Sequence, residues 1–169
     1  MVTRCRWCGD DPLLIAYHDE EWGQPTTDDR LLFEYLTLEI FQSGLSWRTV
    51  LHKRPAFKAA FADFDIEKVA AFGAREVAAL LDDPGIIRNR RKIEATIKNA
   101  GICLGTIRDH GSFYNYLKAL PAEPDEKKRV LSRTFAHVGP TVAESFLQAA
   151  GLIAVKHDPN CFLYQEADR

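Results

Sequence analysis

Apolar residues recur at helical spacing along most of this chain, and no segment shows the strict alternation of a half-buried strand. The clearest case begins near Asn89, where Ile93, Ile97, Ala100 and Leu104 follow one another at steps of four, three and four. Because such steps bring side chains to one face of a helix, this segment predicts an amphipathic helix. No internal repeat appears, so the whole pattern predicts an all-α fold.

The other expected helices are mostly short, and turn residues separate them. Pro55 is expected to divide one segment into two helices, because proline lacks the N–H that a helix interior needs. The stretch 121–128 is polar and contains proline, but it is too short to be a linker between domains. We expect further helices at about residues 13–18, 28–43, 47–52, 57–61, 66–72, 76–81, 114–120, 130–136 and 140–150.

The end of the segment 28–43 combines residue types that conflict. Glu39 follows Leu32 by seven residues and lies on the same apolar face, although burying a carboxylate costs several kcal/mol. Gly44 then ends the helix, and Leu45 and Trp47 place two large apolar groups on a turn. Two interpretations are open. Glu39 is either a carboxylate at the rim of the core or the acid of a pocket that faces an aromatic plate and suits a flat, cationic ligand.

Length and composition indicate one globular domain, which we expect to span residues 1–169. A chain of this size removes roughly 70% of its unfolded surface from water on folding. Hydrophobic residues make up 46% and charged residues 27%, and no run of about eighteen apolar residues would form a membrane span. The first residues also lack the apolar core of a signal peptide, so we expect a cytoplasmic protein.

The net charge is −2, so a nucleic-acid site would have to be a local patch. The densest cationic cluster is Arg88-Asn89-Arg90-Arg91-Lys92, at the entrance of the helix that starts near Asn89. Clusters of this kind are usually solvated helix faces. Arg88, Arg90 and Arg91 are therefore candidates for DNA contact beside that simpler interpretation.

A second candidate for nucleic-acid contact is the turn His137-Val138-Gly139-Pro140-Thr141. Pro140 suits the first turn of a helix, and Thr141 with Glu144 has the spacing of a capping box. A short turn of this kind between two helices can direct backbone N–H groups at a phosphate, with Val138, Gly139 and Thr141 as the candidates. Most such turns only connect helices.

Cysteine and histidine residues pair near both ends of the chain. Cys5-x12-His18 and His157-x3-Cys161 together make a candidate Cys2His2 zinc site that would join the two termini. Cys5-x2-Cys8 is a rival ligand pair with a commoner spacing. Each residue also has a simpler interpretation as an unliganded thiol or a hydrogen-bonded loop histidine.

Four blocks of sequence resemble one known family. They are 11–23 (DPLLIAYHDEEWG), 42–47 (QSGLSW), 85–88 (GIIR) and 138–149, in which VGPT is followed by SF-x-QA. Together they resemble 3-methyladenine DNA glycosylase I, and the match covers nearly the whole chain. The resemblance implies a two-lobed, all-α helix-hairpin-helix glycosylase fold, with the termini joined by one structural zinc ion.

The resemblance also assigns roles to residues of this chain. The zinc ligands fall on Cys5, His18, His157 and Cys161, which favours that set over Cys8. The base pocket falls on Glu39, Tyr17 and Trp47, and its aromatic surround on Trp7 and Trp22. The loop that fills the gap left by a flipped nucleotide falls on Gly44 and Leu45.

The implied activity is base-excision repair of alkylated duplex DNA by a monomer without an organic cofactor or membrane partner. Glu39 would bind the cationic base N3-methyladenine, and water would be the nucleophile that hydrolyses the N-glycosidic bond. The hairpin offers no lysine placed for a Schiff base, so we expect no lyase activity. The alternatives are a zinc-stabilised module that binds DNA lesions without turnover, and a helical protein-binding domain.

The chain departs from the family pattern at three groups of residues, and its region before the hairpin is shorter than in some members. Ile40, followed by Phe41, stands where a small residue usually follows the pocket Glu. Val155-Lys156 replaces the Asn-Asp that often precedes the histidine of the tail, and Glu144 replaces an aromatic residue. Bulk beside the acid predicts a pocket at least as tight as that of the family, and hence a narrow substrate range.

Overall fold

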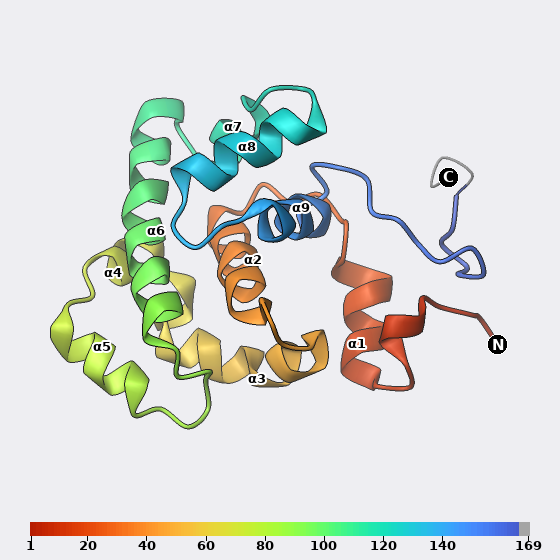
Figure 1. Ribbon diagram of the computed structural model, residues 1–169, viewed down its shortest axis with the longest axis horizontal. Helices are drawn as coiled ribbons and strands as arrows, with labels where there is room; N and C mark the ends of the chain where they lie inside the picture. The colour runs from red at the N-terminus through yellow and green to blue at the C-terminus, as the bar shows by residue number, and fades with distance from the viewer. Residues whose placement is uncertain (166–169) are drawn as a thin grey trace.

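The structure is a computed structural model that describes residues 1–165 (Figure 1), and this part of the chain contains helices and no strand. The all-α prediction is therefore confirmed. The α-helices are α1 (Pro12–Ala16), α2 (Asp29–Gln42), α3 (Trp47–Ala60), α4 (Ile66–Ala70), α5 (Ala74–Leu81), α6 (Arg90–His110), α7 (Phe113–Lys118), α8 (Pro124–Thr134) and α9 (Pro140–Ala149). Short 3-10 turns lie at Arg6–Cys8 and Ala62–Phe64, and Tyr17–Glu21 forms a π-helical turn. Within the described residues, no helix is long and apolar enough to cross a membrane.

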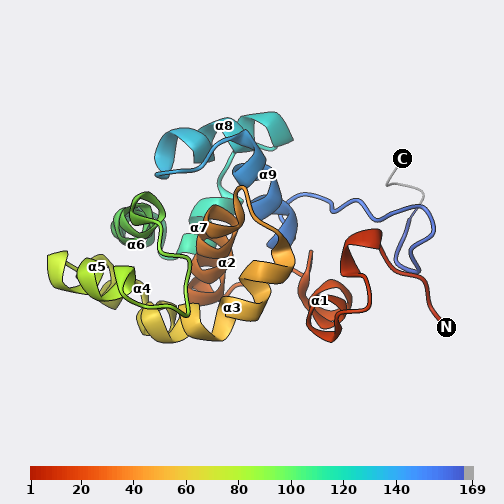
Figure 2. The same cartoon turned by 60° about the horizontal axis from the view of Figure 1, so that its bottom comes forward.

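Helix α2 forms the centre of the helical body and contacts α3, α6, α7 and α9 (Figures 1 and 2). Every residue from Leu32 to Phe41 is buried, as expected for a helix that is covered on nearly all sides. Asp28 caps its first turn by accepting hydrogen bonds from Arg30 N and Leu31 N, and Gly44 follows its end with a positive φ of 82°. The predicted start and end of this helix are thus confirmed.

Helix α3 does not end where the sequence pattern predicted. It runs through Pro55, so the expected division into two helices was wrong. A proline inside a helix costs about 3 kcal/mol, because one backbone hydrogen bond is lost. Burial of Val50, Leu51 and Phe57 on the core side of the same helix offsets this cost. Tertiary packing therefore outweighs the local preference at this position.

Of the two helices that flank residues 135–139, α8 differs from the prediction in its start and α9 only in its cap. Helix α8 begins at Pro124, inside the stretch expected to be a connection, because the Glu123 carboxylate accepts hydrogen bonds from Asp125 N and Glu126 N. Helix α9 begins after Gly139, which is its N-cap, so the expected capping box from Thr141 was wrong. Pro140 occupies the first turn, as predicted.

Helix α6 begins after its cap Asn89 and ends at Gly111, where φ is 89°. Ile93 and Ala100 are fully buried, but Ile97 and Leu104 are only partly buried. The buried face is therefore rotated from the predicted one, and it includes polar side chains.

The segments 3–6 and 158–162 lie side by side near α1 (Figure 1). Phe162 N donates a hydrogen bond of 2.8 Å to Thr3 O, and Arg6 N donates one of 2.7 Å to the Asp158 carboxylate. These backbone contacts align two irregular segments that contribute few helical hydrogen bonds of their own. They also bring the Cys and His residues of both ends together.

Candidate functional site

Glu39 lies in the last turn of α2 and is almost completely buried, with 2% of its surface exposed. Its Oε2 atom has no hydrogen-bond partner within residues 1–165. Burial in this apolar setting raises the pKa of the carboxyl group from 4.5 to about 8. Without a ligand, the acid is therefore partly or mainly protonated near neutral pH. A cation placed against it would favour the ionised form.

Aromatic rings surround this part of the molecule. The Tyr17 and Trp47 rings lie 5.4 Å apart between centroids with 36° between their planes, and Trp7 meets Tyr17 edge-on at 6.2 Å. Trp22 packs edge-on against Trp7 at 5.3 Å. Burial, and then the nearby charge of Glu39, raise the pKa of Tyr17, so its hydroxyl stays protonated and can donate a hydrogen bond.

The π-helical turn Tyr17–Glu21 explains how neighbouring residues serve two different sites. Tyr17 and His18 are both buried, although they are adjacent in sequence. Tyr17 belongs to an apolar cluster with Leu14 and Leu51, whereas His18 faces Cys161. Single π-helical turns are frequent at functional sites because they redirect side chains within a helix. The sequence motif pointed to both residues, but the spacing did not reveal this turn.

An ion-pair network borders the same region, and sequence reasoning missed it. Arg54 of α3 donates hydrogen bonds of 2.8 Å to the carboxylates of Glu21 and Glu34. Glu34 is buried, and its partner Arg54 is largely covered by the surrounding side chains. A cavity of about 380 Å³ lies beside Tyr17 and is also lined by Glu21, Leu51 and Arg54. The partners lie 20 and 33 residues apart, so no local pattern signals the network.

The loop between α2 and α3 presents an apolar side chain to solvent. Leu45 is 40% exposed, which is unusual for leucine in this protein. Gln42 Nε2 donates a hydrogen bond of 2.7 Å to Leu45 O, and Leu45 N donates one of 2.7 Å to Gln42 O. Ser46 then caps α3 by accepting a hydrogen bond from Thr49 N. The loop is thus a tightly bonded turn that holds Leu45 outward next to Trp47.

The structure brings Cys5, His18, His157 and Cys161 together, with one ligand atom from each within 4.8 Å of the others. Cys5 Sγ lies 3.4 Å from His157 Nδ1, and Cys161 Sγ lies 3.5 Å from His18 Nε2 and 3.7 Å from His157 Nδ1. A tetrahedral zinc ion with ordinary Zn–S and Zn–N bonds gives S···N edges of about 3.6 Å. The donor set and its spacing therefore fit zinc. Cys8 is buried nearby but is not one of the four.

A carboxylate supports one of these histidines from behind. His18 Nδ1 lies 2.8 Å from Asp19 Oδ1, which leaves Nε2 facing Cys161. Arg4 in turn donates hydrogen bonds of 2.7 to 2.9 Å to both Asp19 oxygens. Carboxylates in this position fix the tautomer and orientation of metal-binding histidines. Only the fold reveals these contacts of Asp19 and Arg4.

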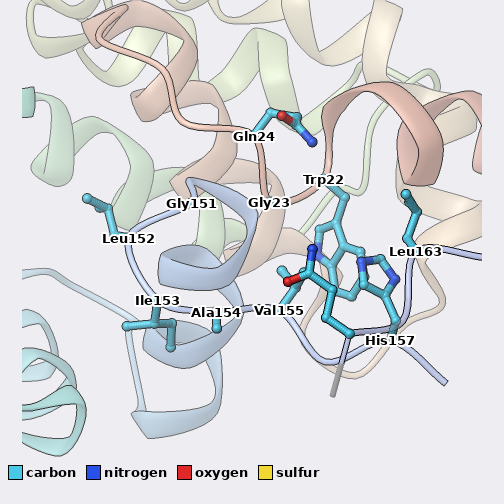
Figure 3. A pocket seen from close by; sticks show the side chains of 11 residues that line it. Trp22, Gly23, Gln24, Gly151, Leu152, Ile153, Ala154, Val155, His157 and Leu163 are labelled. Carbon is cyan, nitrogen blue, oxygen red and sulfur yellow. The ribbon is translucent and has the colours of Figure 1, made fainter. Parts of the chain in front are cut away.

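A cavity of about 390 Å³ lies beside His157, which is one of its lining residues (Figure 3). The Trp22 and His157 rings lie edge-on, 5.2 Å apart, at one end, and Leu152 and Ile153 line the other. Neither Glu39 nor Trp47 lines this cavity, so it is separate from the buried acid.

The cationic cluster divides into two kinds of residue. Arg88, Arg90 and Arg91 are exposed, as a role in DNA contact requires. Arg90 also forms an ion pair of 3.4 Å with Glu94. Lys92, in contrast, turns inward and is buried. The cluster is therefore only partly a surface feature.

The turn between α8 and α9 also presents backbone to solvent. Gly139 and Thr141 are exposed, whereas the Val138 side chain is buried in the core. Val138 can thus contribute to a contact only through its backbone. His137 has a positive φ of 60°, which is uncommon for a residue other than glycine and implies that neighbouring groups hold the turn.

Comparison with known proteins places these features in a family. Residues 7–130 match the family model described as methyladenine glycosylase. The DNA-3-methyladenine glycosylase 1 of Escherichia coli (strain K12) is 42% identical over 184 residues, which cover 96% of this chain and 97% of the relative. A solved structure of 3-methyladenine DNA glycosylase I is 40% identical and has a TM-score of 0.85 over 96% of this chain and 100% of the other. Another, a variant of such an enzyme in complex with 3-methyladenine, is 32% identical with a TM-score of 0.85 over 94% and 96%.

Proposed function

Because the chain belongs to the methyladenine glycosylase family, we propose that it hydrolyses the N-glycosidic bond of 3-methyladenine in alkylated duplex DNA, as the first step of base-excision repair. The single observation that carries this proposal is Glu39. A buried carboxylate with an unpartnered oxygen lies at the end of α2 in an otherwise apolar setting. Such a group is costly unless a ligand supplies the missing partner.

The aromatic rings and the exposed leucine suit a base that has left the DNA stack. Extruding a base costs a few kcal/mol, and damage lowers that cost. Leu45 is placed on a firm turn from which it would enter the vacated space. Trp47 would stack on the extruded base, a contact that contributes about 1–3 kcal/mol. Tyr17 would pack against the base; Trp7 contacts the Tyr17 ring, and Trp22 packs in turn against Trp7.

Glu39 would supply the charge that the reaction needs. Adenine methylated at N3 is cationic while attached to DNA, so it is a good leaving group without a general acid. Its positive charge lowers the pKa of Glu39 from the raised value of the free protein, so binding the lesion ionises the carboxyl group. The resulting carboxylate would also stabilise positive charge that develops on the sugar. The bond between the sugar carbon and the base breaks, and its electron pair goes to the base, which leaves as a neutral molecule. Water bonds to the sugar carbon and loses one proton to the solvent.

None of the proposed pocket residues, which are Tyr17, Glu39, Trp47, Trp7 and Trp22, is a lysine. A Schiff base with the sugar, which lyase activity requires, would therefore lack its amine. We propose a monofunctional glycosylase that leaves the DNA strand intact.

We also propose one structural zinc ion, held by Cys5, His18, His157 and Cys161. Four protein ligands fill a tetrahedral site and leave no position for a reacting water. The contribution of the metal is to stability, on the order of 10 kcal/mol for structural sites. It would hold together two chain ends that have little regular structure.

The DNA backbone would be bound by the turn between α8 and α9 and by the first turn of α6. The backbone N–H groups at Gly139 and Thr141, at the start of α9, suit a phosphate. Arg88, Arg90 and Arg91 are exposed and supply local positive charge in a protein with a net charge of −2.

The test is chromatographic identification of the bases released from methylated duplex DNA, together with a gel for strand breaks. We expect release of 3-methyladenine, little or no 7-methylguanine, and no strand cleavage. Neutral lesions such as hypoxanthine should persist, because they bring no positive charge to ionise Glu39 and their glycosidic bond is not already activated by a cationic leaving group. Abundant hypoxanthine release or nicking would contradict this mechanism. Binding of damaged DNA without release of any base would instead favour a lesion-binding module.

A further inference from the structure

The buried face of α6 carries polar side chains that the proposed chemistry does not use. Lys92, Thr96 and Asn99 follow one another at steps of four and three, and all three are buried. Such side chains are costly to bury unless their hydrogen bonds are satisfied. Each has a hydrogen-bond partner here: the Thr96 hydroxyl donates to Lys92 O at 2.8 Å, within the helix. Lys92 and Asn99 instead reach outside α6.

Lys92 reaches the loop that carries Leu45. Its ammonium group donates hydrogen bonds of 3.1 Å to Phe41 O and 2.7 Å to Ser43 O. These carbonyls belong to the end of α2, where helical partners are missing and a positive charge is favourable. Ser43 is followed directly by Gly44 and Leu45. Lys92 therefore fixes the point from which the exposed leucine projects.

Asn99 reaches the turn between α8 and α9. Its Nδ2 group donates a hydrogen bond of 3.1 Å to Ala136 O, and Ala136 N donates one of 2.7 Å to Asn99 Oδ1. This pair requires a side chain that both donates and accepts, which the amide provides. Ala136 directly precedes His137, the residue with positive φ. Asn99 therefore clamps the backbone at the strained start of the turn.

The two attachments lie on one rigid element. Residues seven apart in a helix are about 10 Å apart along its axis and lie on nearly the same face. Three nucleotides of one strand span a similar distance, at about 3.4 Å each. The loop that carries Leu45 and the turn 136–141 are thus attached to α6 at two points whose separation is comparable to the length of a few nucleotides.

We infer that Lys92 and Asn99 are positioning residues that hold the Leu45 loop and the 136–141 turn in a fixed register, so that both engage one duplex together. Neither residue is among the pocket residues proposed above. The consequence is that freeing either loop weakens binding of DNA with an extruded nucleotide, while the base pocket keeps its own affinity. This inference rests on the proposed function, because it assigns both segments to DNA.

The test compares Lys92→Met and Asn99→Leu with the parent protein. Lys92→Met keeps much of the length but loses the donors, and Asn99→Leu keeps similar bulk but loses donor and acceptor. Thr106→Val is the matched control, because the hydroxyl of this buried threonine of α6 donates to Cys103 O in the same helix and, within residues 1–165, to no other segment. Three quantities are measured: affinity for free 3-methyladenine by tryptophan fluorescence, affinity for duplex DNA with a tetrahydrofuran abasic site, and single-turnover base release.

Both variants should lose about tenfold to a hundredfold in duplex affinity and in single-turnover rate, because displacements near 1 Å have costs of this size. Free-base affinity should stay at the parent value, as should all three quantities in Thr106→Val. Lys92→Arg keeps a cationic donor at this position, so its duplex affinity should stay close to that of the parent. Asn99→Asp, with the same shape, should lose duplex affinity, because it places an acceptor against Ala136 O. The double variant should lose less than the product of the single losses, because freeing one loop already breaks the register.

Parent-like duplex affinity in Lys92→Met and Asn99→Leu would overturn the inference. A parallel loss of free-base affinity would also overturn it, because that result indicates general damage to the fold. If Lys92→Met or Asn99→Leu fails to fold, Lys92→Arg and Asn99→Asp are measured in their place. Equal duplex affinity in these two variants would overturn the inference. A parent protein that binds the abasic duplex but releases no base would contradict the proposed function alone, since duplex affinity tests the positioning role independently.

Discussion

Helix α2 carries two buried glutamates five residues apart, and their surroundings differ completely. Glu34 is 3% exposed and Glu39 is 2% exposed. Glu34 accepts a hydrogen bond of 2.8 Å from Arg54 and lies 3.8 Å from the Lys58 ammonium. Glu39 has one oxygen with no partner in the described part of the chain, and burial raises its pKa to about 8.

The difference separates an acid that holds the fold together from one that the fold leaves ready for a ligand. Buried carboxylates are normally paired, since the loss of hydration is otherwise uncompensated. Glu34 follows that rule by joining α2 to α3. Glu39 departs from it at the place where Tyr17 and Trp47 lie, and the missing partner is what a cationic base would provide. The comparison predicts opposite consequences for the same substitution at the two positions.

The largest effect is expected for base release in Glu39→Gln. The substitution keeps the volume but removes the charge, so release of 3-methyladenine should slow by about tenfold to a thousandfold. The variant should keep some activity, because the cationic base is already a good leaving group. Glu34→Gln, assayed where it is fully folded, should match the parent rate in the same chromatographic assay. Equal rates for the parent and Glu39→Gln would make Glu39 a carboxylate at the rim of the core.

The next largest effect is on stability, and it reverses the order of the two positions. Glu34→Gln leaves the largely buried Arg54 short of a charged partner, so the free energy of unfolding should fall by about 3 kcal/mol. Glu39→Gln removes an unpaired buried acid and should change stability less. Urea denaturation of both variants at neutral pH measures the difference. A larger loss in Glu39→Gln would mean that Glu39 is the structural residue.

A third acid sharpens the comparison, because Asp19 supports another residue. In Asp19→Asn, His18 loses the carboxylate that orients its ring, and Arg4 loses its ion-pair partner. Metal affinity should fall by about tenfold to a hundredfold, as is typical for such supporting carboxylates. Competition with a zinc chelator gives the value. Affinity unchanged from the parent would show that the four ligands hold their geometry unaided.

The smallest effect is expected on the salt dependence of DNA binding. The cationic side chains of residues 88–92 also divide into a buried one, Lys92, and the exposed arginines. Replacing exposed Arg90 and Arg91 together by Gln should reduce the slope of log affinity against log salt by up to about 2, since each phosphate contact contributes about 0.9. Fluorescence anisotropy with duplex DNA over a salt series provides the slope. A slope identical to that of the parent would assign both side chains to a solvated face.

Local signals in the sequence were sufficient for much of the fold. The caps Asp28, Asp65 and Asn89 start helices where predicted, because capping depends on a side chain and the next few N–H groups. Helical spacing singled out the buried Glu39, and the Cys and His pairs near both ends of the chain, with the family resemblance, predicted the four residues that the structure brings together.

The remaining features depend on contacts between distant segments. Pro55 lies within a helix because the core covers that helix, and no local rule accounts for this. Arg54 finds Glu34 and Glu21 only after α2 and α3 have packed. Lys92 looked like one more surface cation, and its inward direction follows from the position of α2 beside α6. Sequence pattern thus predicted elements and candidates, but not the partners of each charge.

The central claim, that Glu39 acts as a carboxylate on the cationic base, is tested most directly by the pH dependence of kcat/KM for release of 3-methyladenine. This quantity reports the pKa values of the free enzyme. The pKa of Glu39 is raised to about 8 and the ionised form is the active one. For the parent, kcat/KM should therefore rise with pH and level off above about pH 8, while Glu39→Gln should give a low and flat profile over the same range. A parent profile that stays flat from about pH 6 to pH 9, or one that Glu39→Gln reproduces, would contradict the account.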